Sequence, residues 1–326
     1  MREITYGEAV KEALAEEMRR DDKVALIGED VGPYGGNFGF LKGLHAEFGE
    51  ERVRDTPISE AAIVGCGLGA AITGMRPVVE LMFCDFIGVA MDQLINQVAK
   101  IRYMFGGQVE VPLTIRTPIG GGRSSAAQHS QSLHAMIAHV PGIKVVVPGT
   151  HEDAKGLLKA AIRDNNPVMV FEHKMMYNKK GLVPDGEIIT PIGKAAVRRE
   201  GTDLTIVAIS SMVYECMAIA DEFAKDGVSI EVIDPRTLVP LDEETIINSV
   251  CKTGKLVIAD EGYETCGFPG EIIRRVVSSQ AFDYLDAPIL TVGTKDVPIP
   301  FSPPLENAVI PTRERIVEAV KNVLGR

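Results

Sequence analysis

Two ionisable residues in this sequence lie in settings that suit proton transfer. Glu60 follows the turn-like segment Thr-Pro-Ile-Ser and opens a run of small and apolar residues that stays uncharged until Arg76. His129 lies in the glycine-fed stretch IGGGRSSAAQHSQS, residues 119–132. Carboxyl and imidazole groups often move protons in enzymes, and burial or a flexible loop tunes them for this work. Glu60 and His129 are therefore the first candidates for acid–base chemistry.

Each candidate also has an ordinary structural explanation, and the residues alone leave both open. A carboxylate in the first turn of a helix capped by Ser59 would be stabilised by about 0.3–1 kcal/mol. His129 could simply be held by neighbouring Ser and Gln side chains. The helix after Ser59 carries glycines at 65, 67, 69 and 74. Each costs the helix about 1 kcal/mol relative to alanine, so we expect a ligand or another backbone to approach it closely.

Other familiar motifs are weak or missing. Gly120 to Gly122 could cradle a phosphate, but the spacing fits neither a P-loop nor a dinucleotide fingerprint. Ser130 next to His129 lacks the G-x-S-x-G context of a serine hydrolase. His134 and His139 are better explained as core or surface residues. The five cysteines form no C-x-x-C pair, and no His, Asp or Glu trio has metal-ligand spacing.

Strands and helices alternate along the chain and must position these residues. A linker is expected over 179–193, between domains 1–178 and 194–326. Strands are expected at 24–28, 77–82, 112–117, 143–148, 167–172, 204–210, 229–234, 255–261 and 288–293. Helices are expected at 5–21, from about 59, and at 86–103, 151–164, 214–226, 242–252, 268–280 and 312–324. This alternation predicts an α/β fold with two parallel-sheet domains, whose ligands bind at the carboxyl ends of the strands.

Composition narrows the classes of partner. The net charge of -11 argues against nucleic acid or an anionic membrane as the main partner. No uncharged apolar stretch approaches the roughly 20 residues that span a bilayer, and the first residues show no signal pattern. Scattered thiols without a pairing motif fit a reducing cytoplasm, which is the expected location.

Several long segments, in order, resemble one known family. They are VALIGEDV, RVRDTPISEAAIVGCGLGAAITGMRPVVE, MDQLINQVAK, AAQHSQS, PGIKVVVPGTHEDAKGLLKAAIRDNNPV and DPRTLVPLD. These segments resemble the beta subunit of the thiamine-diphosphate-dependent decarboxylating component of 2-oxo acid and acetoin dehydrogenase complexes. The resemblance runs from Ile4 to Val323. It implies a transketolase-like domain that binds the pyrimidine of thiamine diphosphate, followed by a transketolase C-terminal-like domain.

The resemblance also implies roles for single residues. Glu60 matches the glutamate that hydrogen-bonds the aminopyrimidine and activates the cofactor, and His129 matches a histidine that serves acyl transfer to a lipoyl group. Cofactor contacts are implied for Glu29, Met82, Phe86 and Tyr34. A structural potassium site of some members matches Leu113, Ala161, Ile162, Asp164 and Asn166.

The partners follow from the same resemblance. An alpha subunit would supply the site for Mg2+ and the diphosphate, and two copies of each chain would form an α2β2 heterotetramer. This chain contains no Gly-Asp-Gly motif of the kind that holds magnesium and diphosphate. A lipoyl domain and a dihydrolipoyl acyltransferase core would receive the acyl group. The segments EHKMMY, DPRTLVPLD and VPIPFSPPLE look closest to pyruvate and acetoin members.

Other functions remain open at this point. Half of a split transketolase would need a phosphate-binding cluster, for which Arg116, Arg123 and His151 are the candidates. A non-catalytic assembly subunit would be expected to lack Glu60 or His129, yet both are present. A nicotinamide-dependent oxidoreductase fits the α/β pattern but would need the glycine fingerprint that is missing.

Overall fold

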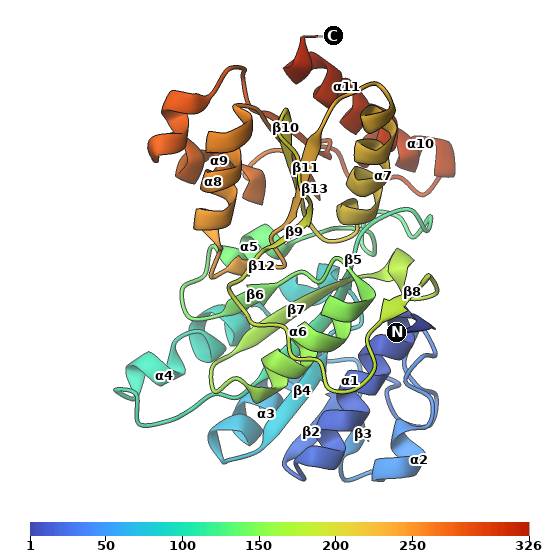
Figure 1. Cartoon of the computed structure of the whole chain (residues 1–326). Coiled ribbons are helices and arrows are strands. Elements are labelled where there is room, and N and C mark those ends of the chain that lie inside the picture. The colour runs from blue at the N-terminus through green and yellow to red at the C-terminus, as the bar shows by residue number, and fades with distance from the viewer. Residues whose placement is uncertain (326) are drawn as a thin grey trace. The chain divides into compact units, whose positions relative to one another are not determined.

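The computed structural model describes residues 1–325, which form two compact units. Unit 1 contains Met1–Ile119 and Met136–Ile192, and unit 2 contains Gly120–Ala135 and the chain from Gly193 onward. Each unit has a central sheet covered by helices (Figure 1). The predicted α/β class is therefore confirmed.

Unit 1 is built on six parallel strands that lie in the order β6-β7-β5-β4-β2-β3. They are β2 (Val24–Gly28), β3 (Val53–Asp55), β4 (Arg76–Glu80), β5 (Thr114–Ile119), β6 (Lys144–Val146) and β7 (Val168–His173). The helices of this part of the chain are α1 (Tyr6–Arg20), α2 (Leu44–Phe48), α3 (Glu60–Ile72), α4 (Ile101–Met104), α5 (His134–Ala138) and α6 (His151–Arg163). Because the strands are parallel, their carboxyl ends share one edge.

The two faces of this sheet are covered by different helices. Val78 of β4 belongs to a buried cluster that includes residues of α1 and α6. The next residue, Val79, lies against α3, where a Cβ added to Gly67 would come within 2.5 Å of a Val79 methyl group. Successive side chains of a strand point to opposite faces, so β4 is buried from both sides.

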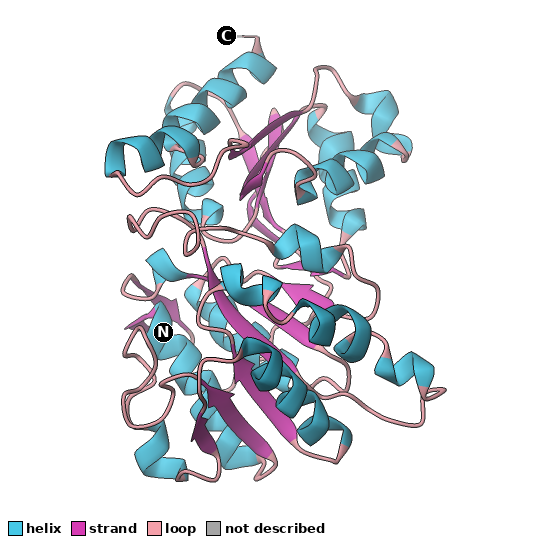
Figure 2. Ribbon diagram, turned by 180° about the vertical axis from the view of Figure 1, so that it is seen from behind, coloured by secondary structure: helices cyan, strands magenta, loops and turns pink. Residues whose placement is uncertain are grey.

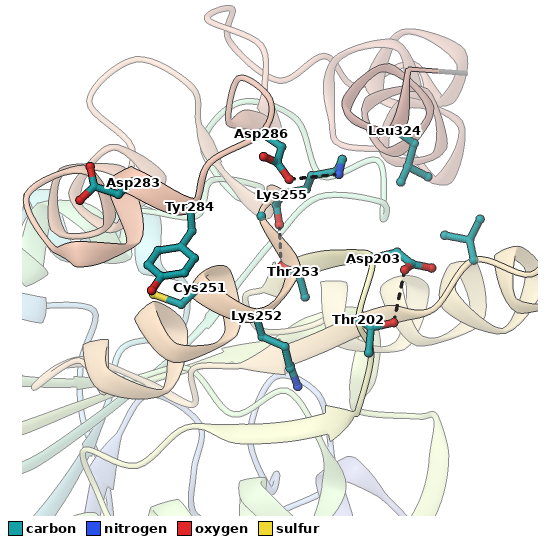
Figure 3. Close-up of a pocket in the computed structure, with 12 residues that line it drawn as sticks. Thr202, Asp203, Cys251, Lys252, Thr253, Lys255, Asp283, Tyr284, Asp286 and Leu324 are labelled. Carbon is teal, nitrogen blue, oxygen red and sulfur yellow. Dashed lines mark hydrogen bonds and ion pairs between the residues drawn. The ribbon is translucent and has the colours of Figure 1, made fainter.

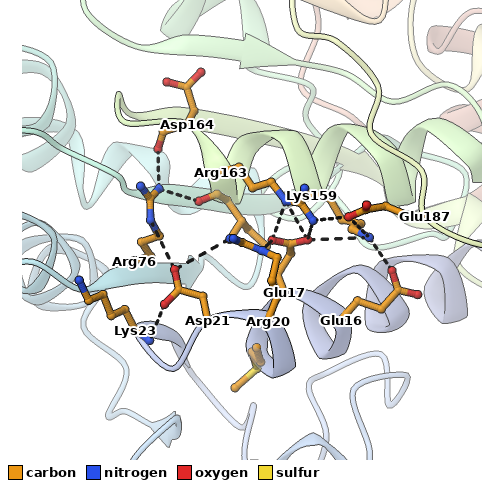
Figure 4. Close-up of polar contacts among 12 residues, drawn as sticks. Glu16, Glu17, Arg20, Asp21, Lys23, Arg76, Lys159, Arg163, Asp164 and Glu187 are labelled. Carbon is orange, nitrogen blue, oxygen red and sulfur yellow. Dashed lines mark hydrogen bonds and ion pairs between the residues drawn. The ribbon is translucent and has the colours of Figure 1, made fainter.

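Ion pairs join α1 to α6 on the first of these faces (Figure 4). The Glu17 carboxylate is buried and accepts from the Arg163 guanidinium at 2.7 Å. Lys155 and Lys159, also buried, each donate to Glu16 at 2.6 Å. Buried charges persist only when they are paired, so this network fixes how the two helices lie against each other.

Unit 2 is built on five strands in the order β14-β13-β10-β11-β9. Four are parallel, and the edge strand β9 runs antiparallel to β11. Helices lie on both sides of this sheet (Figure 2). These five strands are β9 (Ala196–Arg199), β10 (Leu204–Ala208), β11 (Ile230–Asp234), β13 (Leu256–Tyr263) and β14 (Leu290–Thr294), and a short strand outside this sheet, β12 (Thr237–Val239), follows β11. The helices are α7 (Met212–Lys225), α8 (Glu243–Thr253), α9 (Phe268–Val277), α10 (Pro303–Val309) and α11 (Arg313–Leu324), with a short 3-10 turn η4 (Gln280–Tyr284).

The segment 179–193, which is expected to be a linker, contains a short strand. Within it, β8 (Lys180–Val183) pairs antiparallel with β1 (Arg2–Thr5), and a 3-10 turn η3 (Lys174–Met176) precedes it. Thr190 N donates to Gly156 O at 3.2 Å, so the segment packs on unit 1 as far as Ile192. The short antiparallel strands escaped sequence analysis because each has only four residues.

The long helix expected over 86–103 is interrupted. A 3-10 turn η1 (Cys84–Gly88) and a π-helical turn η2 (Gln93–Val98) precede α4. The Ala99 N–H donates to Leu94 O at 3.0 Å, the i to i+5 bond of a π turn. Gln93 lies against Gly65 of α3, where an added Cβ would be 3.3 Å from Gln93 Oε1. Such a contact cannot be anticipated from helical periodicity.

The cysteines do not cross-link the fold, since all five are free thiols: Cys66, Cys84, Cys216, Cys251 and Cys266. Across residues 1–325, every helix is too short or too polar to cross a lipid bilayer.

Candidate functional site

Two buried carboxylates lie at the carboxyl edge of the unit 1 sheet. Glu29 directly follows β2, and Glu60 opens α3 shortly after β3. The Thr56 N–H donates to Gly28 O at 3.0 Å, which ties the segment before α3 to the end of β2. The structure therefore brings Glu29 and Glu60 to the edge where parallel sheets bind ligands.

Glu60 is buried although it begins a helix, and only 6% of its surface is exposed. Ser59 occupies the N-cap position, but its side chain makes no capping hydrogen bond. A first-turn carboxylate that served only the helix dipole would remain in water, because burying it opposes ionisation. The burial of Glu60 therefore favours a role beyond helix stabilisation.

Glu29 is electrostatically coupled to Glu60. Burial raises the pKa of the Glu29 carboxyl group above 4.5, and the nearby Glu60 and Asp30 carboxylates raise it further. Glu29 Oε1 and the neighbouring Thr56 Oγ1 are buried and have no hydrogen-bond partner within residues 1–325. Buried polar atoms are nearly always paired in folded proteins. This edge therefore fits a polar ligand that supplies hydrogen bonds, as the ring of an aminopyrimidine would.

The glycines of α3 have different surroundings. Gly67 packs against β4, where a Cβ would meet Val79 at 2.5 Å. Added Cβ atoms at Gly69 and Gly74 would have nothing within 4 Å. The expected close approach is therefore found between helix and sheet at Gly67, whereas Gly69 of α3 and Gly74, just after the helix, face open space within this chain.

A series of aromatic side chains connects Phe86, a predicted contact of the cofactor ring, with the interior of unit 1. Phe86 lies in η1 and its ring meets Phe83 edge-on, with centroids 5.8 Å apart. Phe83 meets Phe38 at 5.9 Å, and Phe38 meets Tyr177 at 4.8 Å. Edge-to-face contacts at these distances are favourable. The series fixes Phe86 to the glycine-rich loop 31–43 and, through it, to the interior of the unit.

Met82 and Tyr34 differ in how far the structure supports a ligand contact. Met82 follows β4 and is half-buried at the same edge as Glu29 and Glu60. Tyr34, in the glycine-rich loop, is 61% exposed. Met82 is thus positioned beside the candidate site, and a cofactor contact by Tyr34 stays a prediction.

A buried ion cluster beneath the sheet edge was missed by sequence analysis. Arg116 of β5 pairs with Glu80 of β4, and its Nε donates to Glu172 of β7 at 2.9 Å. The Tyr177 hydroxyl donates to Glu172 at 2.8 Å, and burial together with Glu172 raises the pKa of Tyr177. The sequence carries one signal for this cluster, because each of three predicted apolar strands has a charged residue near its end. Arg116 therefore has a structural role in this cluster and is not available to bind a phosphate.

His129 lies in the segment Gly120–Ala135, which belongs to unit 2, whereas Glu60 belongs to unit 1. The His129 side chain is half-buried. Four residues between 120 and 126 have left-handed backbone conformations: Gly120, Gly122, Ser124 and Ala126. The segment therefore follows a tightly turned path that must be held by other contacts.

The expectation that Gly120 to Gly122 cradle a phosphate does not fit this structure. The Gly121 N–H donates to Glu261, and the Gly122 N–H donates to Glu306 Oε1 at 2.9 Å. The backbone donors that would face an anion are therefore bound to carboxylates of the same chain. The glycine pattern alone could not show this, because the acceptors lie far along the sequence.

Three other histidines that the sequence analysis considered have surroundings that agree with structural roles. His134 is buried and its Nε2 lies 3.0 Å from Asp260 Oδ2. His139 is exposed. His151 Nε2 lies 2.8 Å from Lys179 O, and burial lowers the pKa of this imidazole. His151 is therefore engaged with the backbone and is a poor phosphate ligand.

The residues of the predicted potassium site form one corner of unit 1. Arg76 donates to Ile162 O at 3.1 Å and to Asp164 O at 3.2 Å. The Asp164 carboxylate pairs with Lys144, and Leu113 O accepts the Val168 N–H at 3.0 Å. Two cationic side chains therefore already contact oxygens of this corner, and a potassium ion there stays a prediction. Within residues 1–325, no group of three or more His, Cys, Asp or Glu side chains is arranged to hold a metal ion.

An open pocket in unit 2 contains none of the predicted site residues (Figure 3). Its two lysines are already paired. Lys252 donates to Glu200 at 2.9 Å and also contacts Glu231, and Lys255 lies 3.9 Å from Asp286. The lysines of this pocket are therefore engaged with carboxylates of the same unit.

Comparison with known families agrees with the two units. The family described as "Transketolase, pyrimidine binding domain" matches residues 2–180, and "Transketolase, C-terminal domain" matches residues 193–316. Among solved structures, the chain is similar to "Split gene transketolase, inactive beta4 tetramer". That similarity has a TM-score of 0.81 and 25% identity, over 99% of this chain and 98% of that one.

Curated relatives cover nearly the whole chain. The beta subunit of acetoin:2,6-dichlorophenolindophenol oxidoreductase from Bacillus subtilis (strain 168) is 47% identical, over 99% of this chain and 98% of its own. The pyruvate dehydrogenase E1 component subunit beta from Rhizobium meliloti (strain 1021) is 47% identical, over 99% of this chain and 70% of its own. The 2-oxoisovalerate dehydrogenase subunit beta from Bacillus subtilis (strain 168) is 44% identical, over 98% of both chains. With its transketolase-type domains and these full-length similarities, the chain belongs to the family of E1 beta subunits of 2-oxo acid and acetoin dehydrogenases.

Proposed function

We propose that this chain, with an alpha subunit, cleaves pyruvate or acetoin on thiamine diphosphate and passes the acetyl group reductively to a lipoyl domain. The observation that carries the proposal is the pair of buried carboxylates, Glu29 and Glu60, at the carboxyl edge of the unit 1 sheet. Glu29 Oε1 has no partner in the described chain, which favours a ligand ring at this edge.

Bound thiamine diphosphate supplies the carbanion chemistry, and the residues of this chain bind, orient and move protons. Glu60 would hold a proton at a ring nitrogen of the pyrimidine. Burial and the nearby Glu60 raise the pKa of the Glu29 carboxyl group, which favours its neutral form and so lowers the charge repulsion within the pair. Phe86 and Met82 would pack against the pyrimidine ring, and the aromatic contacts of Phe86 would hold the Phe86 side chain in place.

The diphosphate and its Mg2+ would be held by the alpha subunit. This inference rests on the family and on the lack of a Gly-Asp-Gly motif in the sequence. An α2β2 heterotetramer is the expected assembly, with an acyltransferase core as the next partner. A potassium ion at Leu113, Ala161, Ile162, Asp164 and Asn166 is part of the proposal, and melting of the assembled protein in K+ against Na+ buffers tests it.

His129 would act in the second half of the reaction. The acyl fragment would form a C–S bond to one lipoyl sulfur while the S–S bond breaks, so the disulfide would take up two electrons. The fragment's hydroxyl proton would go to solvent as its bond to the cofactor breaks, with the bonding electrons returning to the cofactor. The second sulfur leaves as a thiolate, and a proton from His129 converts it to a thiol. A half-buried histidine on a loop suits such a transfer.

Half of a split transketolase is the second candidate, because one similar structure carries that description. Two of its three phosphate-binding candidates are engaged elsewhere. Arg116 is paired with Glu80 and Glu172, and His151 contacts a backbone oxygen. The two dehydrogenase relatives at 47% identity, against 25% for the transketolase structure, also favour the first candidate.

Calorimetric titration with thiamine diphosphate and Mg2+ tests the shared site. We expect no binding to this chain alone and tight binding to the chain co-expressed with its alpha partner. Tight binding by the chain alone would contradict the proposal, because a complete diphosphate site would then be present in it. Substrate assays on the mixture with pyruvate, acetoin and branched 2-oxo acids would then identify the substrate.

A further inference from the structure

Buried carboxylates of unit 2 hold the segment that carries His129. Glu306, in α10, accepts the Gly122 N–H at 2.9 Å through Oε1 and the Ser124 N–H at 2.9 Å through Oε2. Glu261, in β13, accepts the Gly121 N–H. Three backbone donors within residues 121–124 are thus bound by two side chains more than a hundred residues away in sequence.

These contacts are strong because of their surroundings. Glu306 is 2% exposed and Glu261 is 8% exposed. A carboxylate that accepts backbone N–H groups away from water makes charge-assisted hydrogen bonds, roughly twice as strong as neutral ones. A Cβ added to Gly121 would be 3.1 Å from Ile310 and 3.4 Å from Glu306 Oε1, so the segment lies close against α10 and the residues after it.

The same segment is fixed at its far end. His134 lies 3.0 Å from Asp260, the residue before Glu261 in β13. His129 lies between the two anchored ends, five residues after Ser124 and five before His134. The left-handed conformations of Ser124 and Ala126 cost free energy and persist only where surrounding contacts enforce them.

We propose that Glu306 is a positioning residue for His129: its two carboxylate oxygens hold the backbone that sets where the imidazole meets the lipoyl group. The proposal rests on the role of His129 given above. Glu306 itself touches neither the cofactor nor the reacting atoms. A glutamine in its place keeps the shape of the side chain, and its amide oxygen can still accept one of the two backbone N–H groups. Its NH2 group faces the other N–H group, so that hydrogen bond is lost and two donors oppose each other.

The test compares two reactions of the same holoenzyme, assembled with the alpha subunit and thiamine diphosphate. One is acyl transfer to a lipoyl domain, and the other is reduction of the dye 2,6-dichlorophenolindophenol, which takes electrons without a departing thiolate. For Glu306→Gln we expect the ratio of lipoyl transfer to dye reduction to fall about tenfold, the effect of roughly one lost charge-assisted hydrogen bond. Glu306→Asp, which retains the charge, should recover part of the ratio.

Glu231→Gln is the matched control. Glu231 is a buried carboxylate of the same unit that accepts the Gly201 N–H at 3.2 Å and does not contact the segment 120–135. It should leave the ratio unchanged. His129→Ala tests the underlying role: if it lowers the ratio while Glu306→Gln does not, the positioning proposal is wrong. If His129→Ala leaves the ratio unchanged, the proposed role of His129 is wrong instead.

A second readout does not depend on activity. Amide hydrogen exchange of peptides that contain residues 121–124 should speed up in Glu306→Gln and stay as in the wild type in Glu231→Gln. Unchanged exchange in Glu306→Gln would overturn the proposal. Because exchange is measured on any folded chain, this result stands even where Glu306→Gln assembles poorly with the alpha subunit.

Discussion

Glu29 and Glu60 share one buried edge of a sheet, and two ionised carboxylates are costly to keep together there. The structure resolves the conflict by raising the pKa of Glu29, first through burial and then through Glu60. A carboxyl group accepts hydrogen bonds when it is ionised and donates one when it is protonated, so a pair that exchanges protons can offer both kinds of contact. An aminopyrimidine presents both donors and acceptors, so the chemistry of the pair matches the proposed ligand.

Stability should therefore depend on pH through Glu29. A carboxyl group whose folded pKa is raised binds its proton more tightly in the folded state. Its contribution to the free energy of unfolding is fully present below the unfolded pKa near 4.5 and is lost as pH rises through the folded pKa. Glu29→Gln removes this titration, so we expect the wild type to lose stability relative to Glu29→Gln as pH rises above about 4.5. Urea unfolding at several pH values measures the difference, and parallel curves would contradict it.

The Arg116 cluster predicts a large loss of stability. Arg116→Met leaves the buried Glu80 and Glu172 carboxylates without their cation. Removing one partner of a buried pair costs about 3–5 kcal/mol. Arg54→Met is the control, because the Arg54 and Glu51 side chains are largely exposed and such pairs contribute about 0–1 kcal/mol. Equal effects of the two substitutions in denaturant unfolding would be incompatible with a structural role for the cluster.

At the scale of elements, α3 connects the site to the sheet. Its first residue is Glu60, and two turns later Gly67 packs on Val79 of β4. The helix thereby sets the depth at which Glu60 lies above the strand ends. A larger residue at this contact would move the helix and the carboxylate together.

Two glycine substitutions in α3 test this arrangement. Gly67→Ala places a Cβ 2.5 Å from a Val79 methyl group, and we expect overpacking to cost about 1–3 kcal/mol. Gly69→Ala meets nothing within 4 Å, and alanine favours helix by about 1 kcal/mol, so the chain alone should become more stable. Thermal unfolding of both variants gives the comparison. A stabilising Gly67→Ala would mean that the helix is not fixed against β4.

Sequence patterns predicted regular elements well and special contacts poorly. The final helix, expected at 312–324, is α11 (Arg313–Leu324), and the first strand, expected at 24–28, is β2 (Val24–Gly28). Periodicity sufficed there because each element has one apolar pattern. The π turn over Gln93–Val98 follows from packing on another helix, which periodicity cannot encode.

The candidate site shows the same limit. Glu60 was identifiable from its charge at the start of an apolar helix. Glu261 and Glu306 were not, because their partners are backbone N–H groups of a segment far away in sequence. The assignment of residues 120–135 to unit 2 likewise depends on these long-range contacts.

At the scale of the whole molecule, each unit carries part of the proposed chemistry. Unit 1 holds the Glu29–Glu60 pair, and unit 2 holds His129 on its anchored segment. The proposed alpha subunit would add the diphosphate site, so neither the first nor the second half of the proposed reaction would be complete in this chain. Activity should therefore be a property of the assembly, and assays need the alpha subunit throughout.

Turnover by Glu60→Gln in the assembled enzyme is the most direct test of the central claim. Glutamine keeps the size and burial of Glu60 but cannot exchange a proton, so kcat should fall by about 10²–10⁴. Gel filtration should show intact assembly, and Glu51→Gln, at an exposed carboxylate, should retain wild-type turnover. A Glu60→Gln enzyme that assembles fully and turns over at the wild-type rate would contradict the role of Glu60 in activating the cofactor.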